Sequence, residues 1–481
     1  VLPAESLYAI EHDTMDTTFR SMYQGLYIYL SARKERRDLL LSQRPPRFDE
    51  SLDSMISRSE DDFTRIALKA KAAQDYFLLI GPPGTGKTSC ALKKMVETFH
   101  ADKDAQILLL SYTNRAVDEI CKSLASIDPA VDFIRVGSEL SCDEAYRGHL
   151  IENELSSCNR RSEVYERIRN CRIIVGTVAA ISGKPELFRL KHFDVAIIDE
   201  ATQILEPQLL GILCARGEDG KDAIDKFVLI GDHKQLPAVV QQNTEQSAIY
   251  DESLLSIGLT NLKDSLFERL YRNCTATVHR SYDMLCRQGR MHPEVALFAN
   301  RAFYGGRLIP VGLPHQIESS DTICRLAFYP SVPEKAGASA KINYSEARIV
   351  ADLAARIYED HQTDFDESRT LGIITPYRSQ IALIKKEIES LGIPALNRIL
   401  VDTVERFQGS ERDVIIYSFC VNYPYQLKFL SNLTEEEGVL IDRKLNVALT
   451  RARKQMFITG VPELLERNPL YKSLLKLIES F

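Results

Sequence analysis

Short apolar runs alternate with polar, helix-forming stretches from residue 63 to the end of the chain. Each run is rich in Val, Ile and Leu and is closed by a glycine-containing or polar turn, which is typical of strands buried on both faces of a parallel sheet. The expected strands of the first half are 77–81, 107–111, 172–177, 195–199 and 226–232. Those of the second half are 371–375, 399–403, 413–418 and 455–460. The pattern predicts an α/β fold with two parallel-sheet domains in tandem.

The domain limits follow from the places where this pattern changes. We expect the first α/β domain over 51–275 and the second over 276–481, because a new set of elements begins near Tyr282. Within the first domain, 118–170 is longer than one crossover helix and rich in charge. This stretch predicts a helical insertion.

Residues 1–50 follow a different pattern, with an alternating strand at 6–13, a helix over 19–32 and a charged helix over 34–43. The strand has no neighbour in this part of the chain, and the chain lacks an initial methionine. We therefore expect residues 1–50 to form a helical N-terminal stalk and the remnant of an upstream accessory domain.

The composition is typical of folded domains. Hydrophobic residues make up 44% and charged residues 26% of the 481, which excludes a mostly disordered chain. The 60 basic and 67 acidic residues give a net charge of −7, which argues against a general basic coat but allows a local basic groove. The chain has no run of about 18 apolar residues, so no membrane span is predicted. Its first residues lack a signal-peptide pattern.

Ten cysteines are spread over the chain without a CxxC pair or a Cys/His cluster. A zinc or iron–sulfur site is therefore not indicated. Reduced thiols are typical of an intracellular protein, which would be cytoplasmic if the source is bacterial.

A glycine-rich loop follows the first expected strand and opens a helix, which is the context that a P-loop requires. Its residues are Gly81, Pro82, Pro83, Gly84, Thr85, Gly86, Lys87 and Thr88. Gly84 and Gly86 let backbone N–H groups surround the β-phosphate, and the helix N-terminus adds positive potential. Lys87 is expected to reach the β- and γ-phosphates as a catalytic residue, and the Thr88 hydroxyl to bind Mg²⁺.

Asp199 and Glu200 end a second buried strand, in the motif IIDEAT. An isolated Asp-Glu pair at a strand end is usually solvated charge, but a P-loop earlier on the same sheet favours a catalytic interpretation. Asp199 would then hold Mg²⁺, directly or through water, and Glu200 would orient and deprotonate the attacking water. The two motifs together predict hydrolysis of a nucleoside triphosphate.

Two further motifs follow expected strands. GDHKQLP, over 231–237, places Gln235 where it can sense the γ-phosphate and carry its loss to the second domain. SYTN, over 111–114, places hydroxyl and amide groups at the end of a strand, where they suit phosphodiester oxygens. Tyr112 fits a core aromatic equally well. The P-loop and acidic motifs alone leave kinases, transporters, GTPases and signalling ATPases open.

Eight motifs occur in order along the chain. They are GPPGTGKT (81–88), SYTNRAVD (111–118), DEAT (199–202), GDHKQLP (231–237), QGRMHP (288–293), TPYRSQ (375–380), VDTVERFQGSERD (401–413) and NVALTRAR (446–453). This series resembles the superfamily 1B helicases of the Upf1-like group, which act 5′→3′ and include an RNA helicase of nonsense-mediated decay and a nuclease–helicase of DNA replication and end resection. The resemblance covers about residues 60–465. It implies two tandem RecA-like P-loop NTPase domains, with ATP and Mg²⁺ in the cleft between them and a single strand of nucleic acid across their top.

The resemblance also gives roles to residues of the second domain. It implies that Arg290 and Arg451 are catalytic and reach across the cleft to the γ-phosphate, where such a residue contributes about 10³–10⁵ in rate. Glu411 matches the acidic residue that binds the ribose, whereas Arg453 fits a structural role better than a catalytic one. The matching nucleic-acid contacts are Thr113, Asn114, Thr177, Tyr377, Arg378 and Thr403. For Arg378, a surface ion pair is the alternative.

The chain departs from the family pattern at two places. Gly289 stands where the family has a tyrosine that would stack on the base, and the stretch 60–74 before the P-loop strand lacks the family's Asn-x-x-Gln pattern. Because both features would recognise adenine, we expect weak base discrimination.

The sequence thus predicts an ATP-dependent helicase or translocase on single-stranded nucleic acid, with DNA favoured over RNA and no membrane partner. Phosphate contacts do not distinguish the two sugars, so an RNA- or RNP-remodelling helicase is an alternative. The chain also fits the motor half of a nuclease–helicase whose nuclease and barrel domains lie upstream. A non-motor ATPase switch is a third alternative, but it would not need the nucleic-acid motifs.

Overall fold

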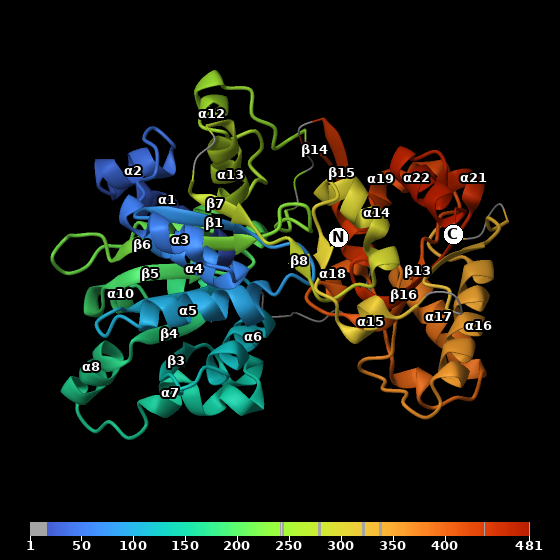
Figure 1. Ribbon diagram of the computed structural model, residues 1–481, viewed down its shortest axis with the longest axis horizontal. Helices are drawn as coiled ribbons and strands as arrows, with labels where there is room; N and C mark the ends of the chain where they lie inside the picture. The colour runs from blue at the N-terminus through green and yellow to red at the C-terminus, as the bar shows by residue number, and fades with distance from the viewer. Residues whose placement is uncertain are drawn as a thin grey trace, which may run out of the picture.

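A computed structural model describes residues 17–480, except for 241, 243, 244, 278, 279, 320–322, 336–338 and 437. The strand expected at 6–13 lies outside the described residues. Two α/β domains lie side by side in Figure 1, the first coloured blue to green and the second yellow to red. None of the described helices combines the length and the apolar character that crossing a membrane requires.

The first domain is built on a seven-stranded sheet of order β3-β4-β2-β5-β6-β1-β7, in which every pair is parallel. Its strands are β1 Tyr76–Ile80, β2 Ile107–Ser111, β3 Phe133–Val136, β4 Ile173–Thr177, β5 Phe193–Ile198, β6 Ile224–Gly231 and β7 Tyr282–Met284. The helices before and among the first six strands are α1 Thr17–Ser31, α2 Lys34–Leu40, α3 Asp53–Arg58, α4 Asp62–Ala72, α5 Lys93–His100, α6 Asn114–Ala125, α7 Ile151–Glu154, α8 Arg161–Asn170, α9 Val178–Ser182, α10 Glu186–Leu190 and α11 Glu206–Leu213. Helices α12 Glu252–Ser256 and α13 Leu266–Ala276 follow β6.

The alternating directions of the side chains along β1 explain why helices cover both faces of this sheet. Phe77 and Leu79 pack into one core with α4, α5 and α6, whereas Leu78 and Ile80 pack into another with α9, α11 and α13. Successive side chains of a strand point to opposite faces, so a run that is apolar throughout requires a layer of helices on each side.

The second domain has a five-stranded sheet of order β10-β16-β13-β11-β12, again parallel throughout. Its strands are β10 Leu326–Pro330, β11 Leu371–Ile374, β12 Leu400–Asp402, β13 Arg412–Ser418 and β16 Ala452–Gly460. The helices are α14 Pro293–Tyr304, α15 Pro314–Ile317, α16 Tyr344–Asp360, α17 Arg378–Ser390, α18 Val404–Phe407, α19 Leu427–Leu430, α20 Arg443–Leu449, α21 Pro462–Leu465 and α22 Pro469–Ile478. Helices α16 and α17 pack on one face of the sheet, and α14, α20 and α22 on the other.

Two short ribbons complete the second half. The pair β8 Arg287–Gln288 and β9 Ile309–Pro310 is parallel, and the pair β14 Leu433–Glu436 and β15 Val439–Asp442 is antiparallel. The second pair lies at the boundary between the two domains in Figure 1.

All nine strands predicted from apolar runs are present, and the structure corrects two other predictions. The stretch 118–170 is not simply a helical insertion, because its residues 133–136 form β3 at the edge of the main sheet. Residues 282–284, assigned by the sequence to the second domain, form β7 and pair with β1 of the first sheet. Both strands are short, and the YDM sequence of β7 has no apolar run that could reveal it.

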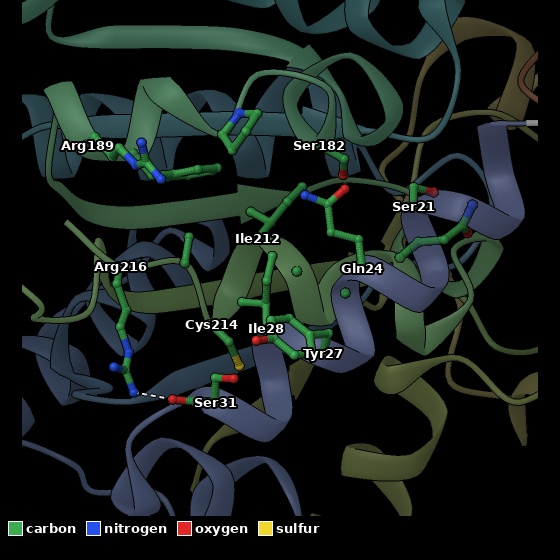
Figure 2. Close-up of a pocket in the computed structure, with 16 residues that line it drawn as sticks. Ser21, Gln24, Tyr27, Ile28, Ser31, Ser182, Arg189, Ile212, Cys214 and Arg216 are labelled. Carbon is green, nitrogen blue, oxygen red and sulfur yellow. Dashed lines mark hydrogen bonds between the residues drawn. The ribbon is translucent and has the colours of Figure 1, made fainter. Parts of the chain in front are cut away.

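The N-terminal helix α1 is docked on the first domain along α11. The two helices cross closely at Gly25 and Gly211, because a Cβ on Gly25 would lie 2.2 Å from the Pro207 carbonyl oxygen. A cavity of about 250 Å³ lies beside this crossing, lined by α1, α11 and the segment that carries Ser182 and Arg189. Figure 2 shows it, together with the hydrogen bond from Arg216 to the carbonyl of Ser31.

A buried carboxyl group lies beneath the second sheet. Glu346 of α16 is 0% exposed. Its Oε2 accepts hydrogen bonds from the Ser418 hydroxyl at 2.6 Å and from the Cys420 backbone N–H at 2.8 Å. Burial raises the pKa of Glu346 to about 7. The group therefore favours the folded state fully below pH about 4.5, and this contribution is lost as the pH rises to about 7.

We expect Glu346→Gln to stabilise the protein above neutral pH, because the amide removes the cost of ionising a buried group. The gain in free energy of unfolding over the wild type should be small near pH 5 and reach at most about 3 kcal/mol near pH 8. Denaturation midpoints at both pH values measure it. The control is Asp352→Asn on the exposed side of α16, which should show no such pH trend. An equal effect of Glu346→Gln at both pH values would contradict the prediction.

Candidate active site

The P-loop turns at the carboxyl end of β1, where close backbone packing requires its glycines. Gly84 and Gly86 have φ angles of 73° and 75°, in the left-handed region that favours glycine. A Cβ on Gly81 would lie 2.0 Å from Cγ of Lys87, so the lysine side chain lies directly over this position. The loop thus bends back over its own strand and aims Lys87 into the cleft.

An acidic pair from β5 meets the P-loop side chains. The Thr88 hydroxyl donates to Asp199 Oδ2 at 2.5 Å, and Lys87 Nζ lies 3.5 Å from Glu200 Oε1. Gln203 donates to the other oxygen of Glu200 at 2.9 Å. Burial opposes ionisation of Glu200, but the Lys87 ammonium holds the pKa of Glu200 below its usual range. Burial and the neighbouring Glu200 raise the pKa of Asp199.

The backbone of Glu200 is held in an unusual conformation. Its φ is 52°, in the left-handed region that non-glycine residues rarely adopt, while the N–H of Glu200 donates to Asp199 Oδ1 at 2.8 Å. Such residues cluster at functional sites, where the surrounding structure fixes them. The turn directs the two adjacent carboxylates to different partners, Asp199 to the Thr88 hydroxyl and Glu200 to Lys87.

Gln235 links the first domain to Arg451 of the second. Its amide nitrogen donates to Asp232 Oδ2 at 2.7 Å, and its amide oxygen accepts from Arg451 Nη2 at 3.2 Å. The hydroxyl of Tyr304 also donates to Asp232 Oδ2 at 2.7 Å and accepts from Asn446 Nδ2 at 2.8 Å. Arg451 is only 2% exposed. Burial and the nearby Arg290 lower the pKa of Arg451 to about 9, so it remains cationic at neutral pH.

Arg290 packs directly against the P-loop. The Gly289 N–H donates to the Gly84 carbonyl at 2.8 Å, and a Cβ on Gly84 would lie 2.4 Å from the Arg290 Cβ. Arg290 Nε donates to Glu411 Oε2 at 2.5 Å. The carboxylate proposed to bind ribose is therefore paired with one of the two predicted arginines. Arg453 pairs with Asp413 on β13 at 3.2 Å.

These groups surround one cleft of about 910 Å³ between the two sheets. It is lined by the whole segment 82–88, by Asp199, Glu200 and Gln235 of the first domain, and by Arg290, Glu411 and Arg451 of the second. The Thr88 hydroxyl and the Asp199 carboxylate supply the hard oxygen ligands that Mg²⁺ prefers, so they are the residues that would hold it. The arrangement can bind a triphosphate between two domains and activate a water beside it.

Two family models, each described as an AAA domain, match this chain, one over residues 262–463 and the other over 58–164 and 152–243. The DNA replication ATP-dependent helicase/nuclease DNA2 of Bos taurus is 27% identical over 100% of this chain and 46% of its own length. The helicase/nuclease JHS1 of Arabidopsis thaliana is 28% identical, over 99% and 35% respectively. These matches confirm the resemblance of the chain to the superfamily 1B helicases of the Upf1-like group.

One further curated relative and one solved structure are similar to this chain. The DNA polymerase alpha-associated DNA helicase A of Saccharomyces cerevisiae is 24% identical over 95% of this chain and 73% of its own length. An arterivirus nonstructural protein 10 helicase, solved in complex with DNA, aligns with a TM-score of 0.42 at 15% identity, over 85% of this chain and 65% of that one. The chain spans less than half the length of the first two relatives.

The residues predicted to contact nucleic acid lie at or just after the carboxyl ends of strands. Thr113 and Asn114 follow β2, and Thr177 ends β4, its neighbour in the first sheet. Tyr377 and Arg378 follow β11, and Thr403 follows β12, its neighbour in the second sheet. The structure therefore brings them together as one group on each domain.

Two of these hydroxyl groups also act as helix caps. The Oγ1 of Thr113 accepts from the Ala116 N–H at 3.2 Å, and that of Thr177 from the Ala180 N–H at 3.1 Å. Each hydroxyl keeps its own proton, which it can donate to a phosphate oxygen. Thr113 also lines the nucleotide cleft itself. Within the described part of the chain, no ion pair involves Arg378, which leaves its guanidinium available to nucleic acid.

Several residues of this candidate site were not found from the sequence. Glu436 of β14 accepts from His233 Nε2 at 2.9 Å and lies 3.4 Å from Lys234 Nζ, so the hairpin contacts the loop that carries Gln235. Tyr304 and Asn446 reach the same loop from α14 and α20. Asn446 opens the NVALTRAR motif, which was the available signal. Tyr304 and Glu436 lie outside the eight motifs.

We expect Tyr304→Phe to impair turnover without impairing nucleotide binding. The change removes one of two hydrogen bonds that fix Asp232 Oδ2, and Asp232 in turn orients Gln235 toward Arg451. We expect kcat of triphosphate hydrolysis to fall about tenfold, the effect of one buried hydrogen bond to a charged group, with little change in KM. Steady-state kinetics measure both.

The matched control is Tyr471→Phe. The Tyr471 hydroxyl donates to Asp442 Oδ2 at 2.9 Å, in a second buried Tyr–Asp pair that lies within the second domain and does not contact Gln235. Equal losses in both variants would attribute the effect to general stability and count against the positioning role of Tyr304.

Proposed function

We propose that this chain couples ATP hydrolysis to 5′→3′ movement along single-stranded nucleic acid, and that DNA is its preferred track. The observation that carries the proposal is the contact of the buried Arg451 with Gln235 at the cleft that Lys87 and Glu200 also line. A guanidinium from one domain and a P-loop from the other then share one γ-phosphate. Binding and loss of that phosphate change the contact between the domains.

The mechanism assigns a task to each group. Lys87 binds the β- and γ-phosphates, and Glu200 orients the attacking water and accepts its proton. Mg²⁺, held by Thr88 and Asp199, would neutralise charge on the phosphate oxygens. Arg290 and Arg451 stabilise the charge that develops on the γ-phosphate in the transition state. When phosphate leaves, the domains separate, and an alternating grip on the strand converts separation into steps.

DNA is favoured because two of the curated relatives are named as DNA replication helicase/nucleases and a third as a DNA helicase. The strand would pass over the carboxyl ends of β2 and β4 in the first domain and of β11 and β12 in the second. We further propose that the chain works next to an upstream nuclease or barrel domain, since the helicase/nuclease relatives are more than twice its length. Ten free cysteines support an intracellular location, cytoplasmic if the source is bacterial.

The decisive experiment is ATP hydrolysis measured alone, with single-stranded DNA and with single-stranded RNA, at low and moderate salt. We expect DNA to stimulate turnover most, and binding of the strand to weaken steeply with salt because phosphate contacts dominate. Equal or greater stimulation by RNA would favour RNP remodelling. Intact turnover with no stimulation by either would contradict the helicase proposal for this chain.

Two substitutions separate binding from chemistry. Lys87→Ala should abolish nucleotide binding because the phosphates lose their cation, whereas Glu200→Gln should retain binding and lose turnover because the amide cannot accept a proton. Equilibrium titration and steady-state hydrolysis measure the two effects. The matched controls are Lys94→Ala and Glu97→Gln, whose side chains pair with each other on α5 at 3.3 Å, apart from the cleft lining. Normal turnover in Glu200→Gln would refute its role as the base.

A further inference from the structure

The glycine at position 289 is not required by the backbone. Gly289 does not have a positive φ, so a residue with a side chain could adopt the same conformation. A Cβ there would lie 3.3 Å from Leu313 Cδ1 and 3.4 Å from Val311 Cγ2, both at the flexible ends of side chains. This position therefore simply lacks a side chain, and apolar groups from the segment after β9 lie beside it.

On the first domain, an aromatic ring enters the same cleft. Phe63, in the first turn of α4, lines the cleft, and its Cζ would lie 3.5 Å from a Cβ on Gly86 of the P-loop. The polar groups around it are used to begin the helix, because Asp61 Oδ2 accepts from both the N–H and the hydroxyl of Thr64, at 2.7 and 2.6 Å. At the start of α4, the ring of Phe63 is therefore the group that a ligand in the cleft could contact.

Gly289 and Phe63 both lie beside the P-loop. Gly289 hydrogen-bonds the P-loop at Gly84, and the Phe63 ring lies beside Gly86, two residues further on. Arg287 and Val311 line the same cleft from β8 and from the residue after β9. An aromatic ring, an isopropyl group and a guanidinium therefore line the cleft into which a triphosphate on the P-loop would carry its base.

Two of the three glutamine amides that line the cleft, and that could hydrogen-bond the edge of a base, are committed elsewhere. Of the glutamines that line the cleft, Gln203 donates to Glu200, and Gln235 is fixed between Asp232 and Arg451. The remaining one, Gln408, lies on the second-domain loop that also carries Glu411. Face contacts with Phe63 are not specific, because every base has a π face.

We propose that this cleft binds the base by face contacts with Phe63 and Val311, and that its substrate class is nucleoside triphosphates in general rather than ATP alone. The inference rests on the proposed hydrolysis and specifies its substrate. Sites that hydrogen-bond a ligand reject analogues that lack the group by about 10⁴–10⁵, whereas apolar sites discriminate far less. The phosphate contacts then supply most of the affinity, and they are the same for every base.

The test is equilibrium binding of ATP, GTP, CTP and UTP with Mg²⁺ to Glu200→Gln, in which bound nucleotide persists, alongside hydrolysis of all four by the wild type. We expect dissociation constants within about tenfold of one another. A preference for ATP over GTP of about a hundredfold or more would overturn the inference and leave the helicase proposal intact. Similar binding of all four without hydrolysis would uphold the inference and refute the proposed hydrolysis.

Substitutions at Phe63 test the ring itself. Phe63→Leu retains apolar volume but removes the π face, and it should weaken binding of all four nucleotides by about ten- to a hundredfold. Phe63→Tyr should retain wild-type binding. The control is Phe48→Leu, because Phe48 packs against the same core but does not line the cleft. Unchanged binding in Phe63→Leu, or an equal loss in Phe48→Leu, would overturn the role of the ring.

Discussion

The guanidinium of Arg451 is buried where the two domains meet, and it needs oxygen acceptors from both. Its own domain supplies the carbonyls of Val447 at 3.0 Å and Ser410 at 3.3 Å, and the first domain supplies the amide oxygen of Gln235. An uncompensated buried charge is strongly destabilising. Separation of the domains therefore removes one acceptor and admits water to the charge, which ties the position of the second domain to the state of the cleft.

The parallel sheets explain why these groups can meet. Polar residues that end parallel strands collect at one edge of a sheet, and the two sheets direct these edges to a common cleft. Lys87 and Glu200 come from the first edge and Arg451 from the segment just before β16 of the second domain. Because each residue is fixed by a rigid strand or helix, a small rotation of one domain moves the whole set together.

The contacts around Gln235 extend this coupling beyond the cleft. Asp232 receives hydrogen bonds from Gln235 and Tyr304, and the hairpin residue Glu436 pairs with His233 and Lys234 of the same loop. The carboxylate of Glu436 is half-buried, which opposes ionisation, yet its basic partners lower its pKa to about 2. The loop that carries Gln235 is thus held by charged and polar groups of the second domain on several sides.

The sequence by itself determined the nine apolar strands, the P-loop, the acidic pair and the order of the motifs, because each depends on neighbours in the chain. A continuous Val, Ile and Leu run must be covered on both faces, and a glycine-rich turn between strand and helix must bend. Only the tertiary structure revealed β7, the pairing of Arg290 with Glu411, the contact of Tyr304 with Asp232 and the entry of Phe63 into the cleft. These depend on residues far apart in the chain, whose meeting is fixed by the packing of whole elements and leaves no local pattern of apolar and polar positions.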